Sequence, residues 1–530
     1  MRLIVDKMQD LYFKSDKAPI VLSALISIHA AIVILMNSFD NPMFFLATPI
    51  LAIVIFLVIL FFLKILEESK LEILPVTGQN HKFRVELVVL FILLAGQIMF
   101  WLAYYPGGFN LDAYGQWDQV HGTEPLDNWH PIITTCIYWL LTRIVDSAAF
   151  CVFFQLIVYS FSMSILMGGL YDAGYEEWLI YTVSAIMTFN PAICMNNVCL
   201  IKDVYFSIGI IWIMYCLLRI YVTDGGWLLS DIHITGLSFA FLFVTLVRHN
   251  GFLFVVPVMV CVCVCYRKYI KKVIVSSLIV LCVVGVLLGP VFSHAKVYRH
   301  SNVIGEISGV PMGIMINSYL NDPGNTPDEV IDLLEGIATR DEWEEHYVVG
   351  EWDSCKWEFG GAVLLKQMTG RDLIDYTLKT IWNSPLTSYQ SFRENTRIVW
   401  QILGRADWSP WVYVESPNEY GIEEKHVSWA NSLVSGIESL SYSPIGIVLI
   451  WSNGVLLLVL HLMVAYVAIL KQYKKLIMIL PVIVYDFLTM LLLSGPNHRY
   501  FYFTSVVFLP IVMIMVLHFE IEDLQEKVTE

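Results

Sequence analysis

The sequence predicts an all-α polytopic membrane protein, and three observations support this fold class. Of the 530 residues, 57% are hydrophobic and only 15% are charged, too few charges to cover a soluble fold of this size. The mean hydropathy is +0.65. The apolar residues fall in repeated runs of about 20 residues that end at charges, Gly or Pro. These runs do not alternate between apolar and polar residues, as the strands of a membrane β-barrel would.

The first two runs, about 18–37 and 43–63, predict a transmembrane hairpin within an N-terminal region of residues 1–83. The first run is longer than the apolar region of a signal peptide, and a second span follows it directly. Basic residues flank both open ends of the hairpin, and such residues favour the cytoplasmic side. We therefore expect a cytoplasmic N-terminus. The flanking residues are Arg2, Lys7, Lys14, Lys17, Lys64, Lys70, Lys82 and Arg84.

Residues 84–292 are predicted to form the transmembrane core. A third span, about 85–104, leads into a polar first external loop, 105–131, that is rich in Gly, Pro and aromatic residues. The later spans in the chain are expected at about 148–170, 179–195, 204–222, 234–247, 252–266, 273–292, 443–470, 476–495 and 501–519.

The segment 131–145 is apolar but short, and it contains Arg143. If it crossed the membrane, the basic clusters at 267–272 and 471–475 would both lie outside, against the usual charge bias. We therefore interpret it as a juxtamembrane or re-entrant helix. The sequence then predicts about 12 spans in a plasma (cytoplasmic) membrane, with both termini cytoplasmic.

Residues 293–442 are expected to be one largely helical extracytoplasmic domain. The segment PDEVIDLLEGI (327–337) has Pro at a helix start, and RDLIDYTLKTIW (371–382) has helical apolar spacing. Residues 443–530 complete the chain with C-terminal spans and a cytoplasmic tail.

Charge and cysteine content narrow the function classes. The net charge of −15 argues against a nucleic-acid partner, which requires clustered basic residues. The run CVCVC at 261–265 has a metal-like spacing, but it lies inside an apolar stretch. We interpret these cysteines as small hydrophobic residues.

The predicted topology places unusual polar residues on one side of the membrane. They occur in PGGFNLD (106–112), NWHP (128–131), Lys202 with Asp203, RHNG (248–251) and PNHRY (496–500). Simpler interpretations stay open: Asp112 can serve a helix start after Asn110, and Lys202 can pair with Asp203. Arg at an apolar span end needs an anion, a carbonyl group or water, which favours a phosphate ligand.

Common nucleotide and metal motifs are missing. The sequence has no P-loop, no HExxH and no GxGxxG after a strand. An external site would not meet cytosolic nucleotides. An anionic phosphate carried by a lipid therefore fits the external Arg and Lys residues best.

As a set, these motifs resemble the GT-C superfamily of membrane glycosyltransferases, and within it a bacterial group. The resemblance covers roughly residues 84–520. It rests on four features: PGGFNLDAYGQWDQ with Asp112, WHPIITTCIYWLL, the interfacial Lys202 and Arg248, and PNHRYFYF.

The resemblance implies transfer of a sugar from a polyprenyl-phosphate donor to an extracytoplasmic acceptor, such as a cell-envelope glycan, lipid or protein. It implies catalytic roles for Asp112, Asp118 and His130. The substrate-binding residues that it implies are Lys202, Arg248, His249, Asn250, His498, Arg499 and Tyr500.

One departure concerns the metal. Many members of the superfamily pair two acids in the first loop, whereas here Ala113 follows Asp112. We therefore assign no metal ligand, and the cofactor stays open. The external domain shows no β pattern of the kind that some members carry, so the acceptor also stays open.

Two alternatives remain. A polymer ligase would share the chemistry but use a lipid-linked oligosaccharide. A lipid or solute transporter would need polar groups near the bilayer midplane and often shows inverted repeats. Charges within the apolar runs are scarce and no repeat is evident, which favours the transferase.

Overall fold

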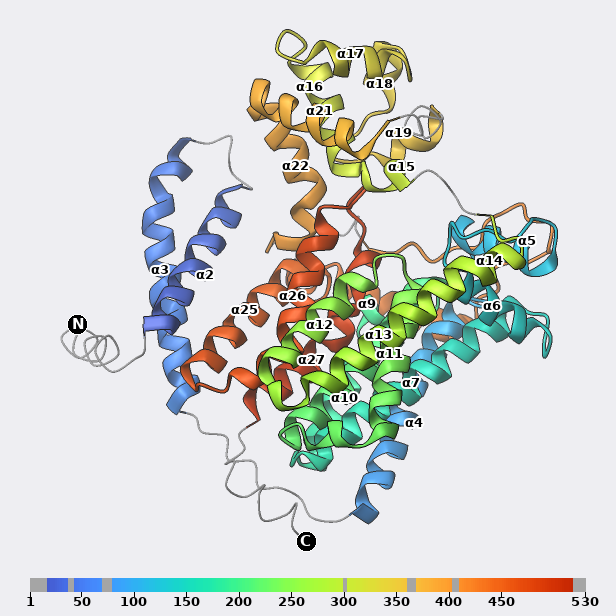
Figure 1. Ribbon diagram of the computed structural model, residues 1–530, viewed down its shortest axis with the longest axis vertical. Helices are drawn as coiled ribbons and strands as arrows, with labels where there is room; N and C mark the ends of the chain where they lie inside the picture. Colours follow the sequence, from blue (N-terminus) through green and yellow to red (C-terminus); the bar gives the residue numbers. More distant parts are fainter. Residues whose placement is uncertain are drawn as a thin grey trace.

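The computed structural model describes residues 17–36, 42–68, 79–298, 303–359, 368–402 and 409–517. Within these ranges the chain is helical, with isolated β-bridges and no sheet. Figure 1 shows a bundle of long helices with a smaller helical lobe at one end. The predicted all-α fold class is confirmed. Of the basic residues expected before the first span, Arg2, Lys7 and Lys14 lie outside the described residues, as does the C-terminal tail after residue 517.

The helices of the bundle correspond to most of the predicted spans. They are α2 (Lys17–Met36), α3 (Pro42–Glu68), α4 (Gln79–Ala103), α7 (Ala148–Asp172), α8 (Glu177–Thr188), α9 (Pro191–Asn197), α10 (Lys202–Val222), α11 (Asp231–Val247), α12 (Phe252–Cys265), α13 (Ile270–Val286), α25 (Asn453–Ile469), α26 (Leu476–Met490) and α27 (Tyr502–Val516).

Shorter helices form the connections and the lobe. They are α5 (Leu111–His121), α6 (Ile132–Thr142), α14 (Phe292–His294), α15 (Val303–Ile307), α16 (Gly309–Asn321), α17 (Asp328–Glu335), α18 (Arg340–His346), α19 (Asp353–Glu358), α21 (Gly370–Asn383), α22 (Pro385–Trp400), α23 (Ser428–Ser441) and α24 (Pro444–Gly446). The helices predicted around 328–337 and 371–382 are present as α17 and α21.

Among the described residues, four helical segments are long and apolar enough to cross a membrane: α4, α7, α10 and Arg267–His294. The number rises to six if each of two bent helix pairs is one span. The protein is therefore a multi-pass α-helical membrane protein by length and composition. The count of 12 spans stays a prediction.

Two expected spans are interrupted. The span expected at 179–195 bends by 63° between α8 and α9, because Asn190 caps α9 and Pro191 opens it. The span expected at 443–470 is broken at Ser452. The Ser452 hydroxyl donates to the Gln401 carbonyl at 2.9 Å, and its oxygen accepts from Val455 N at the start of α25. A run of apolar residues does not reveal such a cap.

Helix α6 has 11 residues, or about 16 Å of rise, about half the thickness of a hydrocarbon core. It packs against α5, α7 and α11. This length agrees with the short helix predicted at 131–145.

The two basic clusters lie together at one end of the bundle. Lys474 pairs with Asp224, and its ammonium lies 5.5 Å from the centre of the Tyr266 ring. Asp224 lies two residues beyond the last residue of α10, whereas Lys202 is the first residue of this helix. Since 21 residues rise about 30 Å, Lys202 lies about one hydrocarbon thickness from the basic clusters.

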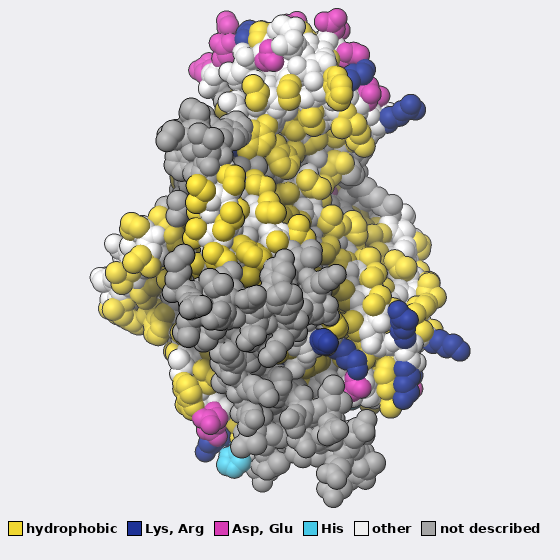
Figure 2. Space-filling view, turned by 90° about the vertical axis from the view of Figure 1, so that its left-hand side faces the viewer, with side chains coloured by type: hydrophobic (Ala, Val, Ile, Leu, Met, Phe, Trp, Pro, Cys, Tyr) yellow, Lys and Arg dark blue, Asp and Glu magenta, His cyan; other side chains and the backbone are white. Residues whose placement is uncertain are grey.

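The bundle surface is apolar where lipid would contact it. Exposed side chains include Phe61 of α3, Phe239 of α11 and Leu281 of α13. Figure 2 shows a broad band of hydrophobic side chains, with acidic side chains gathered at the top and several Lys and Arg residues lower down. A band of this kind is typical of a membrane-embedded surface.

The lobe has a small core of its own, whose buried residues lie between Met312 and Leu373 and include Trp343 and Trp352. The chain then returns to the bundle. Ala430 and Val434 of α23 belong to the main core, and α23 packs along α4. The segment 409–442 therefore covers the end of the bundle instead of extending the lobe.

The arrangement of the basic clusters generates a topology prediction. We expect reporter fusions after Lys272 and after Lys474 to report the cytoplasmic side, because positive clusters are retained there. Fusions at Gly122 and Asn418 should report the opposite side. A cytoplasmic signal from Gly122 together with one from Lys272 would contradict the predicted topology.

Candidate functional site

A tight turn brings Asp112 to the end of the bundle. Gly107 has φ +117°, and a Cβ there would lie 2.6 Å from the Val198 carbonyl oxygen. Gly108 N donates to that carbonyl at 2.9 Å, and Leu200 N donates to the Gly108 carbonyl at 2.8 Å. The loop is thus held against the segment that leads into α10. Glycine is required here because the two backbones touch.

Asn110 then starts α5. Its side-chain oxygen accepts from Ala113 N at 3.1 Å, which is a helix N-cap. The capping role that Asp112 could have had therefore belongs to Asn110. Asp112 lies in the first turn, and its carboxylate is available for other contacts.

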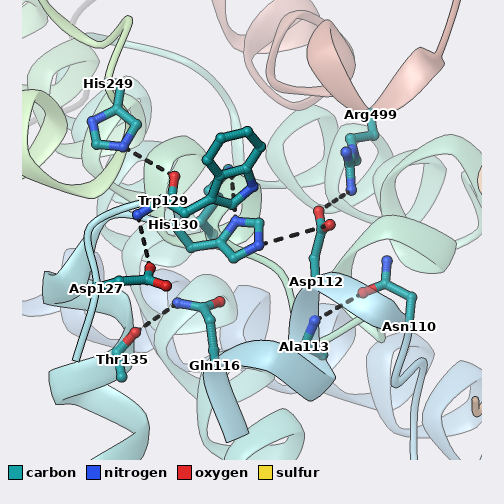
Figure 3. Close-up of polar contacts among 11 residues, drawn as sticks. Asn110, Asp112, Ala113, Gln116, Asp127, Trp129, His130, Thr135, His249 and Arg499 are labelled. Carbon is teal, nitrogen blue, oxygen red and sulfur yellow. Dashed lines mark hydrogen bonds and ion pairs between the residues drawn. The ribbon is translucent and has the colours of Figure 1, made fainter. Parts of the chain in front are cut away.

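Asp112 contacts two of the predicted site residues. Arg499 Nη1 donates to Asp112 Oδ2 at 2.7 Å, and His130 Nε2 lies 3.8 Å from Asp112 Oδ1 (Figure 3). Lys202 Nζ lies 3.0 Å from His130 Nδ1. Since an ammonium group only donates, Nδ1 accepts and the imidazole proton is on Nε2, which faces Asp112. Four predicted residues therefore form a continuous chain from Arg499 to Lys202.

The charges of this chain fix its protonation. Burial raises the pKa of Asp112, but the charges of Arg499 and Lys202 outweigh it and hold the pKa below its ordinary value. Burial and the charge of Lys202 lower the pKa of His130 to about 3. At neutral pH the site therefore holds an ionised Asp112 beside a neutral His130.

Arg248 is engaged elsewhere. Its Nη1 lies 2.8 Å from Asp203 Oδ1, and both side chains are almost completely buried. The guanidinium carbon lies 5.2 Å from the Phe206 ring centre and 5.5 Å from that of Tyr500. Asp203 thus pairs with Arg248, and its neighbour Lys202 contacts His130 instead.

His249 and Asn250, which follow Arg248 in the RHNG motif, contact other segments of the chain. His249 Nε2 lies 3.0 Å from the Asn128 carbonyl oxygen, which ties the motif to the loop that carries His130. Asn250 accepts from the Tyr485 hydroxyl at 3.1 Å. These contacts position the loops, and none of them involves Asp112.

The two residues that flank Arg499 in the HRY motif are His498 and Tyr500. The His498 ring is buried against Trp451 with 5.4 Å between ring centres, and burial lowers its pKa to about 4. Neither of its ring nitrogens has a hydrogen-bond partner. Arg499 lies over the Tyr500 ring, 5.4 Å from its centre. Arg499 Nε is also buried without a partner.

Asp118 lies away from this group. It follows Asp112 by six residues in α5, or about 120° around the helix and about 9 Å along it. It accepts from the Tyr420 hydroxyl at 2.6 Å and from Thr123. The structure does not bring Asp118 together with Arg499.

A cavity of about 520 Å³ opens beside Asp112 and Arg499. Its other wall includes Glu351, Asp353, Trp411 and Tyr413. The sequence prediction missed these four residues because nothing in a polar, Trp-rich segment marks which side chains fold back on Asp112. The available signals were an acid beside an aromatic residue in EWDS (351–354) and two aromatic residues in PWVY (410–413).

No group of three or more His, Cys, Asp or Glu side chains that could hold a metal ion occurs among the residues that the structure describes. Cys261, Cys263 and Cys265 are free thiols of α12. Comparisons with protein-family models, with curated proteins and with solved structures found no match to this chain.

The site places the Arg499 guanidinium beside the Asp112 carboxylate at the edge of a cavity. Arg499 has one N–H group engaged by Asp112 and an unpartnered Nε. Lys202 adds a second positive charge near the same carboxylate. Such a pair can bind a phosphate and place a base next to it.

The buried pair generates a stability prediction. Arg248→Ala should lower the free energy of unfolding by roughly 3–5 kcal/mol, because Asp203 would be left buried and unpaired. The double variant Arg248→Met, Asp203→Asn should lose less, because it removes both charges. Thermal melting of the detergent-solubilised variants measures this. Melting of Arg248→Ala at the wild-type temperature would contradict the structural role.

His130 generates a pH prediction. Above the unfolded-state pKa of about 6.5, the ring is neutral in both states. Below it, the unfolded chain takes up a proton that folded His130 rejects until about pH 3, so stability falls with falling pH. The loss reaches up to about 2 kcal/mol at about pH 5.

His130→Gln should remove this part of the pH dependence of the melting temperature, whereas His81→Gln, at an exposed position of α4, should keep it. The same pH profile in His130→Gln and in the wild type would show that His130 does not contribute to this pH dependence as a buried neutral group.

Proposed function

We propose that the protein is a membrane glycosyltransferase of the GT-C type that moves a sugar from a polyprenyl-phosphate donor to an extracytoplasmic acceptor. The observation that carries the proposal is the Asp112–Arg499 ion pair beside the 520 Å³ cavity. This cavity opens at the end of the bundle opposite the basic clusters. An anion-binding arginine next to a carboxylate, at the edge of an apolar bundle, suits a lipid phosphate.

Arg499 would hold the donor phosphate. Its guanidinium donates to Asp112 through Nη1, and the side chain lines the cavity and is 22% exposed, so it can offer further N–H groups to a phosphate oxygen. Two parallel donors match the geometry of phosphate. Lys202 would add charge from the start of α10 at the level of the lipid headgroups.

The reaction is a direct displacement at the anomeric carbon. The acceptor oxygen forms a bond to that carbon, and the bond from the carbon to the phosphate oxygen breaks. The leaving lipid phosphate keeps the electron pair, and Arg499 and Lys202 stabilise its charge. The acceptor proton goes to Asp112.

Donor binding would also activate the base. In the absence of donor, the charge of Arg499 more than offsets the effect of burial and helps to hold the pKa of Asp112 below its ordinary value. A phosphate that takes up the Arg499 charge weakens this effect. The carboxylate then regains basicity in the state in which a base is needed.

A transporter is the second candidate, because one observation favours it. Asp486 of α26 is completely buried and accepts from Asn453 and Thr504, which come from two other helices. A carboxyl group within an apolar helix often marks a transport path. Movement of substrate across sealed vesicles, without transfer of sugar, would support this candidate against the transferase. A polymer ligase would use the same chemistry with a larger lipid-linked donor.

The assignment of the base generates an activity prediction. Asp112→Asn keeps the shape of the side chain and loses its basicity, so it should lower turnover roughly 100- to 10,000-fold while donor binding survives. Asp118→Asn is the matched control in the same helix, and it should cost much less. Transfer rates and donor affinities in nanodiscs measure both. Retention of more than about a tenth of the wild-type rate by Asp112→Asn would show that Asp112 is not the base.

A further inference from the structure

The cavity beside Asp112 has a second wall that donor binding does not use. Glu351 and Asp353 lie on one part of it, and Trp411 and Tyr413 on another. Its volume of about 520 Å³ lies within the range of small-molecule sites, well above what a phosphate group needs. The wall is therefore large enough for a second substrate.

The acidic part of the wall is held to the loop that carries Arg499. Trp352 N donates to the Ser494 carbonyl at 2.7 Å, and the Ser494 hydroxyl donates to Asp353 Oδ2 at 2.8 Å. Asp353 keeps its second carboxylate oxygen for a ligand. The distance between the acids and Arg499 is thus fixed by backbone and side-chain hydrogen bonds.

The aromatic part of the wall is held to the loop that carries Asp112. Phe109 N donates to the Tyr413 carbonyl at 2.8 Å, and Glu415 N donates to the Phe109 carbonyl at 2.9 Å. The Trp411 side chain is 78% exposed, although its segment is fixed in place. An indole held open at the edge of a cavity offers an apolar face without any packing role.

The carboxylates and aromatic side chains of this wall together indicate which ligands it can bind. Carboxylate oxygens accept hydrogen bonds from hydroxyl and ammonium groups, and an aromatic face packs on the apolar face of a sugar ring. Two carboxylates on this part of the cavity disfavour an anionic ligand there, whereas Arg499 lies on the part that would hold the phosphate. The wall therefore matches a neutral or amino sugar and disfavours a uronic acid or a phosphate.

We propose that Glu351, Asp353, Trp411 and Tyr413 form a carbohydrate-binding subsite for neutral or amino sugars, and that the acceptor hydroxyl is presented to Asp112 from this wall. The acceptor role rests on the proposed function. The binding of sugar does not.

The test measures binding of methyl glucoside, glucosamine and glucuronate to the full-length protein in detergent, by saturation-transfer NMR, without donor. The first two should bind, and glucuronate should bind at least about tenfold more weakly because of the like charges. Trp411→Ala should weaken methyl glucoside about five- to tenfold. Trp382→Ala, an equally exposed Trp of α21 that is 87% accessible, should not.

Glu351→Gln with Asp353→Asn should narrow the difference between glucosamine and glucuronate. Equal binding of glucosamine and glucuronate to the wild type would overturn the proposed subsite. Unchanged binding of methyl glucoside in Trp411→Ala would also overturn it. Because Trp411 is exposed, its replacement leaves the fold intact.

Farnesyl phosphate binding, compared between the wild type and Arg499→Gln, separates this proposal from the proposed function. Sugar binding without farnesyl phosphate binding would contradict the donor site and leave the carbohydrate subsite standing. Farnesyl phosphate binding without any sugar binding would contradict the carbohydrate subsite and leave the donor site standing.

Discussion

The ion pair between Asp112 and Arg499 joins two segments that are 387 residues apart in the chain. Each segment is held in place by other contacts: the glycine turn and Asn110 cap before Asp112, and the Tyr500 ring beneath Arg499. The pair closes the end of the bundle around one cavity. If either side chain were removed, the remaining charge would lose its partner at a site where both side chains are only partly exposed.

The surrounding polar residues divide between chemistry and support. His130 and Lys202 continue the chain from Asp112. Arg248 and Asp203 form a separate, buried pair, and Asn250 contacts Tyr485. Each charge of this pair is buried with its partner, so the removal of one of them is expected to destabilise the fold. The same end of the bundle therefore contains two ion pairs: the buried pair of Arg248 and Asp203, and the pair of Arg499 and Asp112 that borders the cavity.

The sequence predicts the helical class and most helix positions, because long apolar runs and short polar connections are local signals. It also predicts that Asp112, His130, Lys202 and Arg499 share one side, since topology collects span ends. The sequence does not predict which side chains pair with each other. Nothing local assigns Asp203 to Arg248 or removes Asp118 from the site, since these outcomes depend on how helices rotate and pack.

The same limit applies to the helix breaks and to the cavity wall. Ser452 and Asn190 interrupt apolar runs through hydrogen bonds of their side chains, which a hydropathy profile does not register. Asp486 escapes notice for a related reason: one acid in an apolar run is a weak signal until Asn453 and Thr504 are seen beside it. Glu351 reaches the cavity because its neighbour Trp352, in the lobe, donates to the Ser494 carbonyl. Trp411 reaches it because the chain returns from the lobe to the bundle.

The account depends on a lipid phosphate that competes with Asp112 for Arg499. The most direct measurement is an experimental structure of the protein with a bound polyprenyl phosphate. The account predicts phosphate oxygens within hydrogen-bonding distance of Arg499, with the Asp112 carboxylate moved off the guanidinium and facing the cavity. A phosphate bound elsewhere, with the Asp112–Arg499 contact intact, would contradict it.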